Sequence, residues 1–229
     1  MGFRSPPIVL LLIDRRRGAK VVQQVLGALF PGILITDFWG AYNAIQTLAK
    51  QRCYFHLFTE LVKVDKHNAS ATWKRYPRKK LSRLLKDAVC LGERRQSHSP
   101  PTYARRKAKL HQRLDQLIAT RFDDADAKRL SKRLRRHRSE LLAFLDHEGV
   151  SPYNNHAEQQ VGVAVHTRKV SQQNRSLAGA QTHAILLSLF RTAQLQGLNP
   201  VEHVMQLAQA TLCGESTDTS APPDLKKAA

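Results

Sequence analysis

Cysteine is scarce in this sequence: among 229 residues there are three, Cys53, Cys90 and Cys213. A small, odd number of cysteines argues against the disulfide framework of a small secreted domain. Long apolar runs are also missing. The longest, "PPIVLLLI" (residues 6–13), is far too short to cross a bilayer, and "DRRRGAK" follows it where a signal peptide would carry small residues. We therefore expect a cytoplasmic protein with no membrane partner.

Acidic residues are the second shortage, because 18 Asp and Glu face 37 Lys and Arg, giving a net charge of +19. An excess of this size attracts polyanions, of which nucleic acid is the commonest. The charge is concentrated between Lys74 and Arg138, where 22 basic residues stand against 6 acidic ones. Such a segment can be a solvated helical surface, but like charges spaced along helices repel unless an anion neutralises them. Aromatic residues are few there, so we predict contacts to DNA phosphates rather than stacking on bases.

The first 56 residues alternate between two kinds of pattern. Short runs rich in branched apolar residues at 8–13 and 32–36 predict buried strands, and residues 52–56 predict a third, short strand. The segments 18–29 and 41–50 between them predict helices. Strands alternating with helices are typical of parallel βαβ units, whose strands end on one edge of the sheet. We predict an α/β fold with residues 1–56 as the first part of its core.

Residues 57–148 show no strand-like run, and we expect an all-helical basic insertion into the α/β core. The segments 79–94, 102–121 and 124–147 predict its helices. Leucines in the third segment, including Leu130 and Leu145, recur at interrupted helical spacing and predict its buried face.

A second part of the core is expected over residues 149–212. It contains predicted helices at 154–166, 180–197 and 199–212. Gly197 is a stop signal, and Asn199 with Pro200 a start signal. From 213 to 229 the chain is small, polar and Pro-containing, which predicts a disordered tail.

Two isolated carboxylates attract attention. Asp37 follows the run "GILIT", so it sits where open α/β sheets place their chemistry. Glu158 is the only acid between Glu148 and Glu202, and it lies among amides and histidine in "NNHAEQQ". Asp37 could instead be a turn or capping acid, and Glu158 a solvated residue near a helix start. Brought together, such carboxylates could hold magnesium, because hard cations take oxygen ligands.

A C-x-x-H pair, Cys53 and His56, follows at the end of the third predicted strand. The spacing suits a metal, but zinc requires four ligands and no second pair is evident. We expect a structural role for the pair.

Three segments together resemble the insertion-sequence-66 family of bacterial DDE transposases. They are "TDFWGAYNAI", "QRCYFHLFTEL" and, after the helical insertion, "NNHAEQQVGVAVHTRKVSQQNRSLAGAQTHAILLSLFRTAQLQGLNP". The resemblance extends over residues 6–205. It implies a partial RNase H-like core that cuts DNA and joins transposon ends with Mg²⁺ or Mn²⁺, working as a homo-oligomer. Asp37 and Glu158 occupy the positions of the second and third catalytic acids. Arg168, Lys169 and Arg175 would hold the scissile strand.

The first acid of the family is expected on a strand upstream of residues 8–13, so we expect the chain to be amino-terminally truncated. In an intact RNase H-like sheet Asp14 cannot replace that acid, because its strand would lie three places from that of Asp37, or about 14 Å away. The two acids could approach one another only if the missing strands let these two strands pair directly. We therefore expect no catalysis by this chain alone. A DNA-binding remnant or regulator of an intact transposase, an unstable product and an RNA-binding protein are the alternatives.

Overall fold

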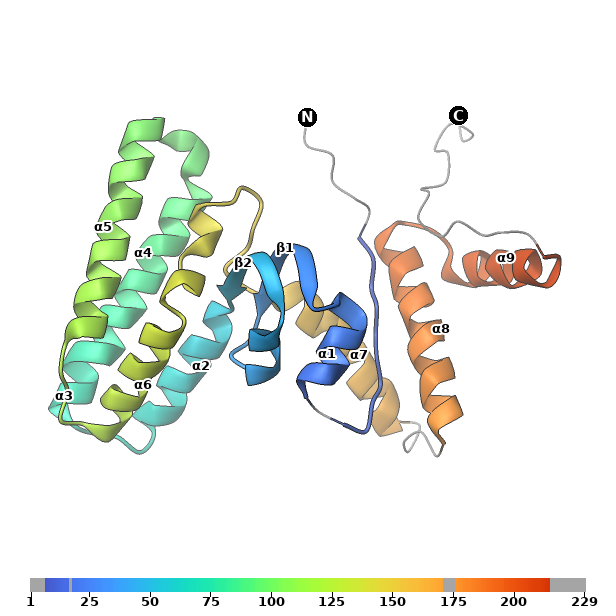
Figure 1. Ribbon diagram of the computed structural model, residues 1–229, viewed down its shortest axis with the longest axis horizontal. Coiled ribbons are helices and arrows are strands. Elements are labelled where there is room, and N and C mark those ends of the chain that lie inside the picture. The colour runs from blue at the N-terminus through green and yellow to red at the C-terminus, as the bar shows by residue number, and fades with distance from the viewer. Residues whose placement is uncertain (1–6, 17, 171–175, 215–229) are drawn as a thin grey trace. The chain divides into compact units, whose positions relative to one another are not determined.

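The computed structural model describes residues 7–16, 18–170 and 176–214, which fall into two compact units (Figure 1). The central unit contains residues 18–154. The terminal unit joins residues 7–16 to the described residues from 155 onward. The chain is α/β and mostly helical, with a small parallel sheet.

The sheet of the central unit has two parallel strands, β1 (Leu29–Thr36) and β2 (Gln46–Arg52). Helix α1 (Ala19–Leu26) precedes β1, and the short 3₁₀ turn η1 (Gly40–Ala44) lies between the strands. The register pairs Thr36 with Arg52, so both strands end at the same edge. That edge therefore receives the residues that follow each strand.

The rest of the central unit is helical, and its main helices are shown in Figure 1. They and the shorter elements between them are α2 (Tyr54–Asp65), α3 (Ala71–Trp73), the π-helical turn η2 (Lys74–Leu81), α4 (Ser82–Glu93), η3 (Arg95–Ser97), α5 (Pro100–Ala119), α6 (Ala125–Arg136), η4 (Arg138–Glu140) and η5 (Ala143–Leu145). Their apolar faces form one core cluster that extends from Tyr54 to Leu145. The burial of these faces, rather than helical propensity, supplies most of the stability of such helices.

The terminal unit contains three helices among its described residues: α7 (Asn155–Val170), α8 (Leu177–Leu195) and α9 (Pro200–Leu212). Gly197 ends α8 with φ of 75°, and the amides of Gly197 and Leu198 donate back to Gln194 and Ala193. This left-handed glycine closes the helix in a Schellman motif. Asn199 then begins α9, and its side chain accepts from the amides that follow it.

The strand predicted at 8–13 is wrong, because these residues belong to no strand or helix. The backbone amides of Val9 and Leu11 donate to the hydroxyls of Thr192 and Ser188 on α8, at 3.0 and 2.9 Å. Val9 is buried, whereas Ile8 is mostly exposed. These two hydroxyls accept the hydrogen bonds that the backbone carbonyls of a neighbouring strand would accept in a sheet.

The helix predicted at 41–50 is also wrong, because the turn η1 and the strand β2 occupy this segment. Gln46, Thr47 and Ala49 pair with residues of β1. Pairing with a neighbouring strand outweighs the helical propensity of the segment, which is a weak influence by itself.

The strand predicted at 52–56 is wrong as well: β2 ends at Arg52, and α2 begins at Tyr54. Tyr54, Leu57, Leu61 and Val64 are all buried, at helical spacing. The predicted βαβαβ order is therefore replaced by helix, strand, 3₁₀ turn, strand and helix.

Other predictions are confirmed. The helix expected at 18–29 is α1, which stops earlier because Gly27 adopts φ of 73°, and the strand expected at 32–36 lies within β1. Helices occupy most of 79–94 and 102–121, and α6 occupies the first part of 124–147. The leucines of the predicted stripe are buried, although 3₁₀ turns carry the last of them. From residue 215 onward the expected tail falls outside the described residues.

Candidate functional site at the carboxyl edge of the sheet

Asp37 directly follows β1 at the carboxyl edge of the sheet, where it is partly buried. Its Oδ1 accepts a hydrogen bond from the amide of Trp39 at 2.9 Å. This two-residue contact is an Asx turn, which fixes the carboxylate relative to the strand end. The amide occupies one of the two carboxylate oxygens. Burial and, next, the charge of Asp37 raise the pKa of Tyr42, while Arg52 opposes them.

Arg52, the last residue of β2, holds the strand ends together from a fully buried position. Its Nη1 donates to the carbonyl oxygen of Asp37 at 2.7 Å and to Thr36 Oγ1 at 3.2 Å. Its Nη2 donates to Asn43 Oδ1 at 2.7 Å. A guanidinium carries several donors in a fixed plane, so it can satisfy this set of oxygens at once. Arg52 therefore fixes the backbone on which the Asp37 carboxylate is mounted.

Glu140 supplies the charge that balances Arg52. The Nε of Arg52 donates to Glu140 Oε2 at 2.5 Å, and His137 Nδ1 lies 2.8 Å from the same oxygen. Burial raises the pKa of Glu140, but the Arg52 and His137 contacts outweigh it, and the net pKa is lowered. The rings of Phe38 and His137 pack edge to face, with their centroids 5.5 Å apart. Arg52 and His137 are buried, Glu140 is partly buried, and all three are paired, which is the condition for keeping charge inside a protein.

Sequence reasoning missed Arg52, His137 and Glu140. The available signal was weak: in "LAKQRCYF", Arg52 directly precedes three residues with apolar or aromatic side chains, but Lys50 and Gln51 make the segment before it polar. That signal does not name a partner, because Glu140 lies 88 residues away and meets Arg52 only through the helical fold.

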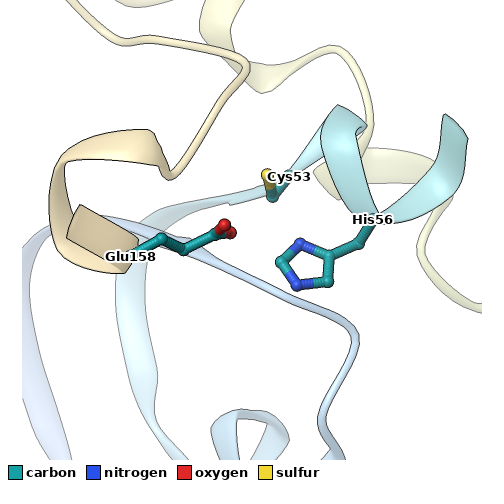
Figure 2. A group of neighbouring side chains, drawn as sticks. All are labelled: Cys53, His56 and Glu158. Carbon is teal, nitrogen blue, oxygen red and sulfur yellow. The ribbon is translucent and has the colours of Figure 1, made fainter. Parts of the chain in front are cut away.

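Cys53 and His56 lie at the same edge, one just after β2 and the other in the first turn of α2 (Figure 2). The Cys53 sulfur and a ring nitrogen of His56 lie within 4.8 Å of one another. Cys53 is fully buried, its amide donates to Thr36 at 2.7 Å, and its sulfur accepts from the amide of Asn154 at 3.3 Å. The thiol therefore joins the strand end to the segment before α7, and the structural role expected for the Cys53–His56 pair stays a prediction.

Glu158 lies in the first turn of α7, in the terminal unit, and is partly buried. A carboxylate there is favoured by the positive end of the helix dipole. Arg168 and Lys169 are exposed in the last turn of the same helix, three turns further along. Arg175 lies outside the described residues.

Asp14 is exposed, and its Oδ1 accepts from the amide of Arg16 at 2.6 Å. Because residues 8–13 form no strand, the expectation that Asp14 ends one is wrong. Its contact is that of a turn residue.

None of the described helices is long and apolar enough to span a bilayer.

These features define a class of protein. It has an α/β unit that holds an aspartate at the carboxyl edge of parallel strands, and a strongly basic helical segment follows that unit. The chain matches the model of the transposase IS66 family over residues 2–182. It belongs to that family.

One curated relative is an uncharacterized protein of Sinorhizobium fredii (strain NBRC 101917 / NGR234), designated y4jD. It is 27% identical over 235 residues, which cover 93% of this chain and 44% of the relative. The chain thus spans less than half the length of this relative. No solved structure matches this chain.

Proposed function

We propose that this chain carries part of the catalytic core of a transposase that cuts DNA at insertion-sequence ends and joins them to a target. Asp37 and Glu158 are its catalytic carboxylates, on an RNase H-like core into which residues 57–148 are inserted. The observation that carries the proposal is the placement of Asp37: a partly buried carboxylate, fixed by the Trp39 amide, at the carboxyl edge of a parallel strand pair. Membership of the IS66 family supplies the reaction class.

The donor set fits a hard divalent cation. Carboxylate oxygens are the ligands that Mg²⁺ and Mn²⁺ prefer, and the Trp39 amide engages one oxygen of Asp37, which has a second. When bound, the ions would activate the attacking oxygen and stabilise the leaving oxygen of a phosphodiester. Cys53 is unsuited to this task, because a thiolate is a soft ligand. Arg52 keeps Asp37 in position by donating a hydrogen bond to its backbone carbonyl, which leaves the carboxylate out of that contact.

The chemistry is a pair of phosphoryl transfers. In cleavage, a water oxygen bonds to phosphorus while the bond from phosphorus to the 3′ oxygen breaks, and that oxygen takes up a proton. In joining, the freed 3′-hydroxyl loses its proton and bonds to a target phosphorus, whose own bond to a 3′ oxygen breaks, and that leaving oxygen takes up a proton. Arg168, Lys169 and Arg175 would hold the scissile strand by its phosphates.

A metal-binding measurement tests the carboxylate roles directly. Mn²⁺ titrated into the purified chain and followed by electron paramagnetic resonance should bind, with affinity reduced at least tenfold in Asp37→Asn and in Glu158→Gln. Asp14→Asn is the matched control, because this exposed acid makes only a local turn contact. Unchanged Mn²⁺ affinity in both variants would exclude the metal role.

Catalysis is the second test. The resemblance assigns two of three catalytic acids to this chain, so we expect no cleavage of plasmid DNA carrying insertion-sequence ends. Cleavage by the purified chain that disappears in Asp37→Ala would overturn this expectation. Light scattering on DNA containing such ends should show whether the protein assembles there as a homo-oligomer.

A non-catalytic regulator is the alternative, favoured by the basic surface of the central unit. Such a protein would bind DNA and inhibit strand transfer by a longer member of the family. Inhibition that persists in Asp37→Asn and Glu158→Gln would support regulation rather than catalysis.

A further inference from the structure

We propose that a groove between α4 and α5 binds one sugar–phosphate backbone of duplex DNA, independently of sequence. The two helices are neighbours in the central unit, joined by the short turn η3 (Figure 1). Two adjoining hollows of about 630 and 350 Å³ lie along them, and both are lined by Asp87, Lys109 and Arg113. Together these hollows form what we call the α4–α5 groove. The inference rests on the proposed function, which it extends by naming a DNA-binding surface.

The groove is strongly cationic. Six basic side chains line it, against one carboxylate among the described lining residues. The basic residues are Lys80, Arg83, Arg94, Arg106, Lys109 and Arg113, and the acid is Asp87. Asp87 is already paired with Arg113 at 2.7 Å, in a partly exposed contact.

Two acids near the groove are paired with cations that do not line it. Asp115 on α5 pairs with Arg138 at 2.8 Å, and Asp146 pairs with Lys107 at 2.5 Å. Across the part of the chain that the structure describes, Arg83, Arg94 and Lys109 have no carboxylate within ion-pair distance, and all three are exposed. Uncompensated cations facing one groove attract an anion with regularly spaced charges.

The dimensions fit one strand of a duplex. Axes of packed helices lie about 8–10 Å apart, so the groove can take one backbone but not a whole duplex. From Arg83 to Arg94 the helical rise is about 16 Å. One strand of B-DNA advances about 3.4 Å per phosphate, so this length corresponds to about five phosphates. The described lining residues include no Phe, Tyr or Trp, which favours phosphate contacts over base stacking.

The test compares two triple variants that remove the same charge from different faces. The groove variant combines Arg83→Gln, Arg94→Gln and Lys109→Gln. The control combines Lys128→Gln, Lys132→Gln and Arg136→Gln, three exposed residues of α6 that do not line the groove. Binding of a 30-base-pair duplex of arbitrary sequence is followed by fluorescence anisotropy at several salt concentrations.

Loss of three phosphate contacts should reduce the magnitude of the salt slope, log K against log [NaCl], by about 3. It should also weaken binding at 0.1 M salt by roughly two orders of magnitude. The α6 control should change the slope by less than about 1. Circular dichroism checks folding. The variant pair Arg83→Lys and Arg94→Lys, which keeps the charge, should keep the slope.

Equal losses in the groove and α6 variants, or no loss in either, would overturn the groove while leaving the proposed function standing. Absence of DNA binding by the unmodified chain would count against both. Tighter binding of an RNA duplex of equal length would overturn the assignment of DNA as the ligand.

Discussion

The buried guanidinium of Arg52 and the carboxylate of Glu140, 88 residues apart in sequence, meet at 2.5 Å and tie the carboxyl edge of the sheet to the segment after α6. Because the same guanidinium also donates to the Asp37 carbonyl, the helical segment and the candidate site share one support. The position of Asp37 therefore depends on a residue far from it in sequence.

Removing the cation should destabilise the central unit. Arg52→Met leaves the partly buried Glu140 without its main partner, and we expect a loss of up to about 3–5 kcal/mol in the free energy of unfolding. Urea unfolding followed by tryptophan fluorescence measures this, because Trp39 and Trp73, the two tryptophans, both lie in this unit. The matched control is Arg138→Met, whose partner Asp115 is about half exposed, and which should cost about 0–1 kcal/mol. Equal costs would show that burial of the pair does not matter.

Acid should destabilise the central unit in two stages. Burial lowers the pKa of His137 below its ordinary 6.5, although its bond to Glu140 opposes this. The pKa of Glu140 is lowered below 4.5, because Arg52 and His137 outweigh burial. A group whose pKa is lowered on folding contributes stability above its unfolded pKa and loses it as pH falls through the folded value. Stability should therefore decline first below about pH 6.5 and again below about pH 4.5.

Urea unfolding at a series of pH values checks this order. His137→Gln, which has no titrating ring, should remove the first stage and leave the second. A first stage unchanged in this variant would assign it to another histidine, such as His111, whose pKa is also lowered mainly by burial.

Gln51 is a buried amide that joins β2 to the segment 141–144. Its Nε2 donates to the carbonyls of Arg52 and Leu141, and its Oε1 accepts from the amide of Phe144 at 3.0 Å. Gln51→Leu keeps the volume but orphans the Phe144 amide, so we expect a loss of about 1–3 kcal/mol by urea unfolding. Tyr54→Phe should cost less, because the Leu141 carbonyl keeps its bond from Gln51. The reverse order would contradict this account.

Two helical glycines should respond oppositely to alanine. A Cβ at Gly92 of α4 would meet the Phe144 ring at 2.8 Å, so Gly92→Ala should destabilise the core by about 1–3 kcal/mol. A Cβ at Gly162 of α7 meets nothing within 4 Å, so Gly162→Ala should stabilise its helix by up to about 1 kcal/mol. Thermal unfolding followed at 222 nm measures both. Stabilisation by Gly92→Ala would mean that the Phe144 ring moves aside without cost. If Gly92→Ala is destabilising, adding Phe144→Leu should relieve the crowding and recover part of the loss.

Local signals in the sequence were sufficient for the helices of the terminal unit, where Gly197 and Asn199 mark boundaries that need no distant partner. They were also sufficient for the strand before Asp37, and the aspartate lies at its end as predicted. They failed at β2, because the segment becomes a strand only by pairing with β1.

The same limit applies to the candidate site. The spacing of Cys53 and His56 is visible in the sequence, and so is the isolation of Asp37. The support that Arg52 receives from Glu140 is not visible, because it depends on how the intervening helices pack. The metal-binding roles of Asp37 and Glu158 remain predictions.

The segment that begins the described chain is fastened by residues near its end: Val9 bonds to Thr192, 183 positions later. A ribosome adds about 5–20 residues per second, so Val9 waits roughly 10–40 s before its partner is synthesised. During translation, the apolar residues 8–13 are therefore a nascent segment without a docking place. We expect them to be a target for chaperones until α8 emerges, and the terminal unit to complete its folding only after synthesis of the helices on which it depends.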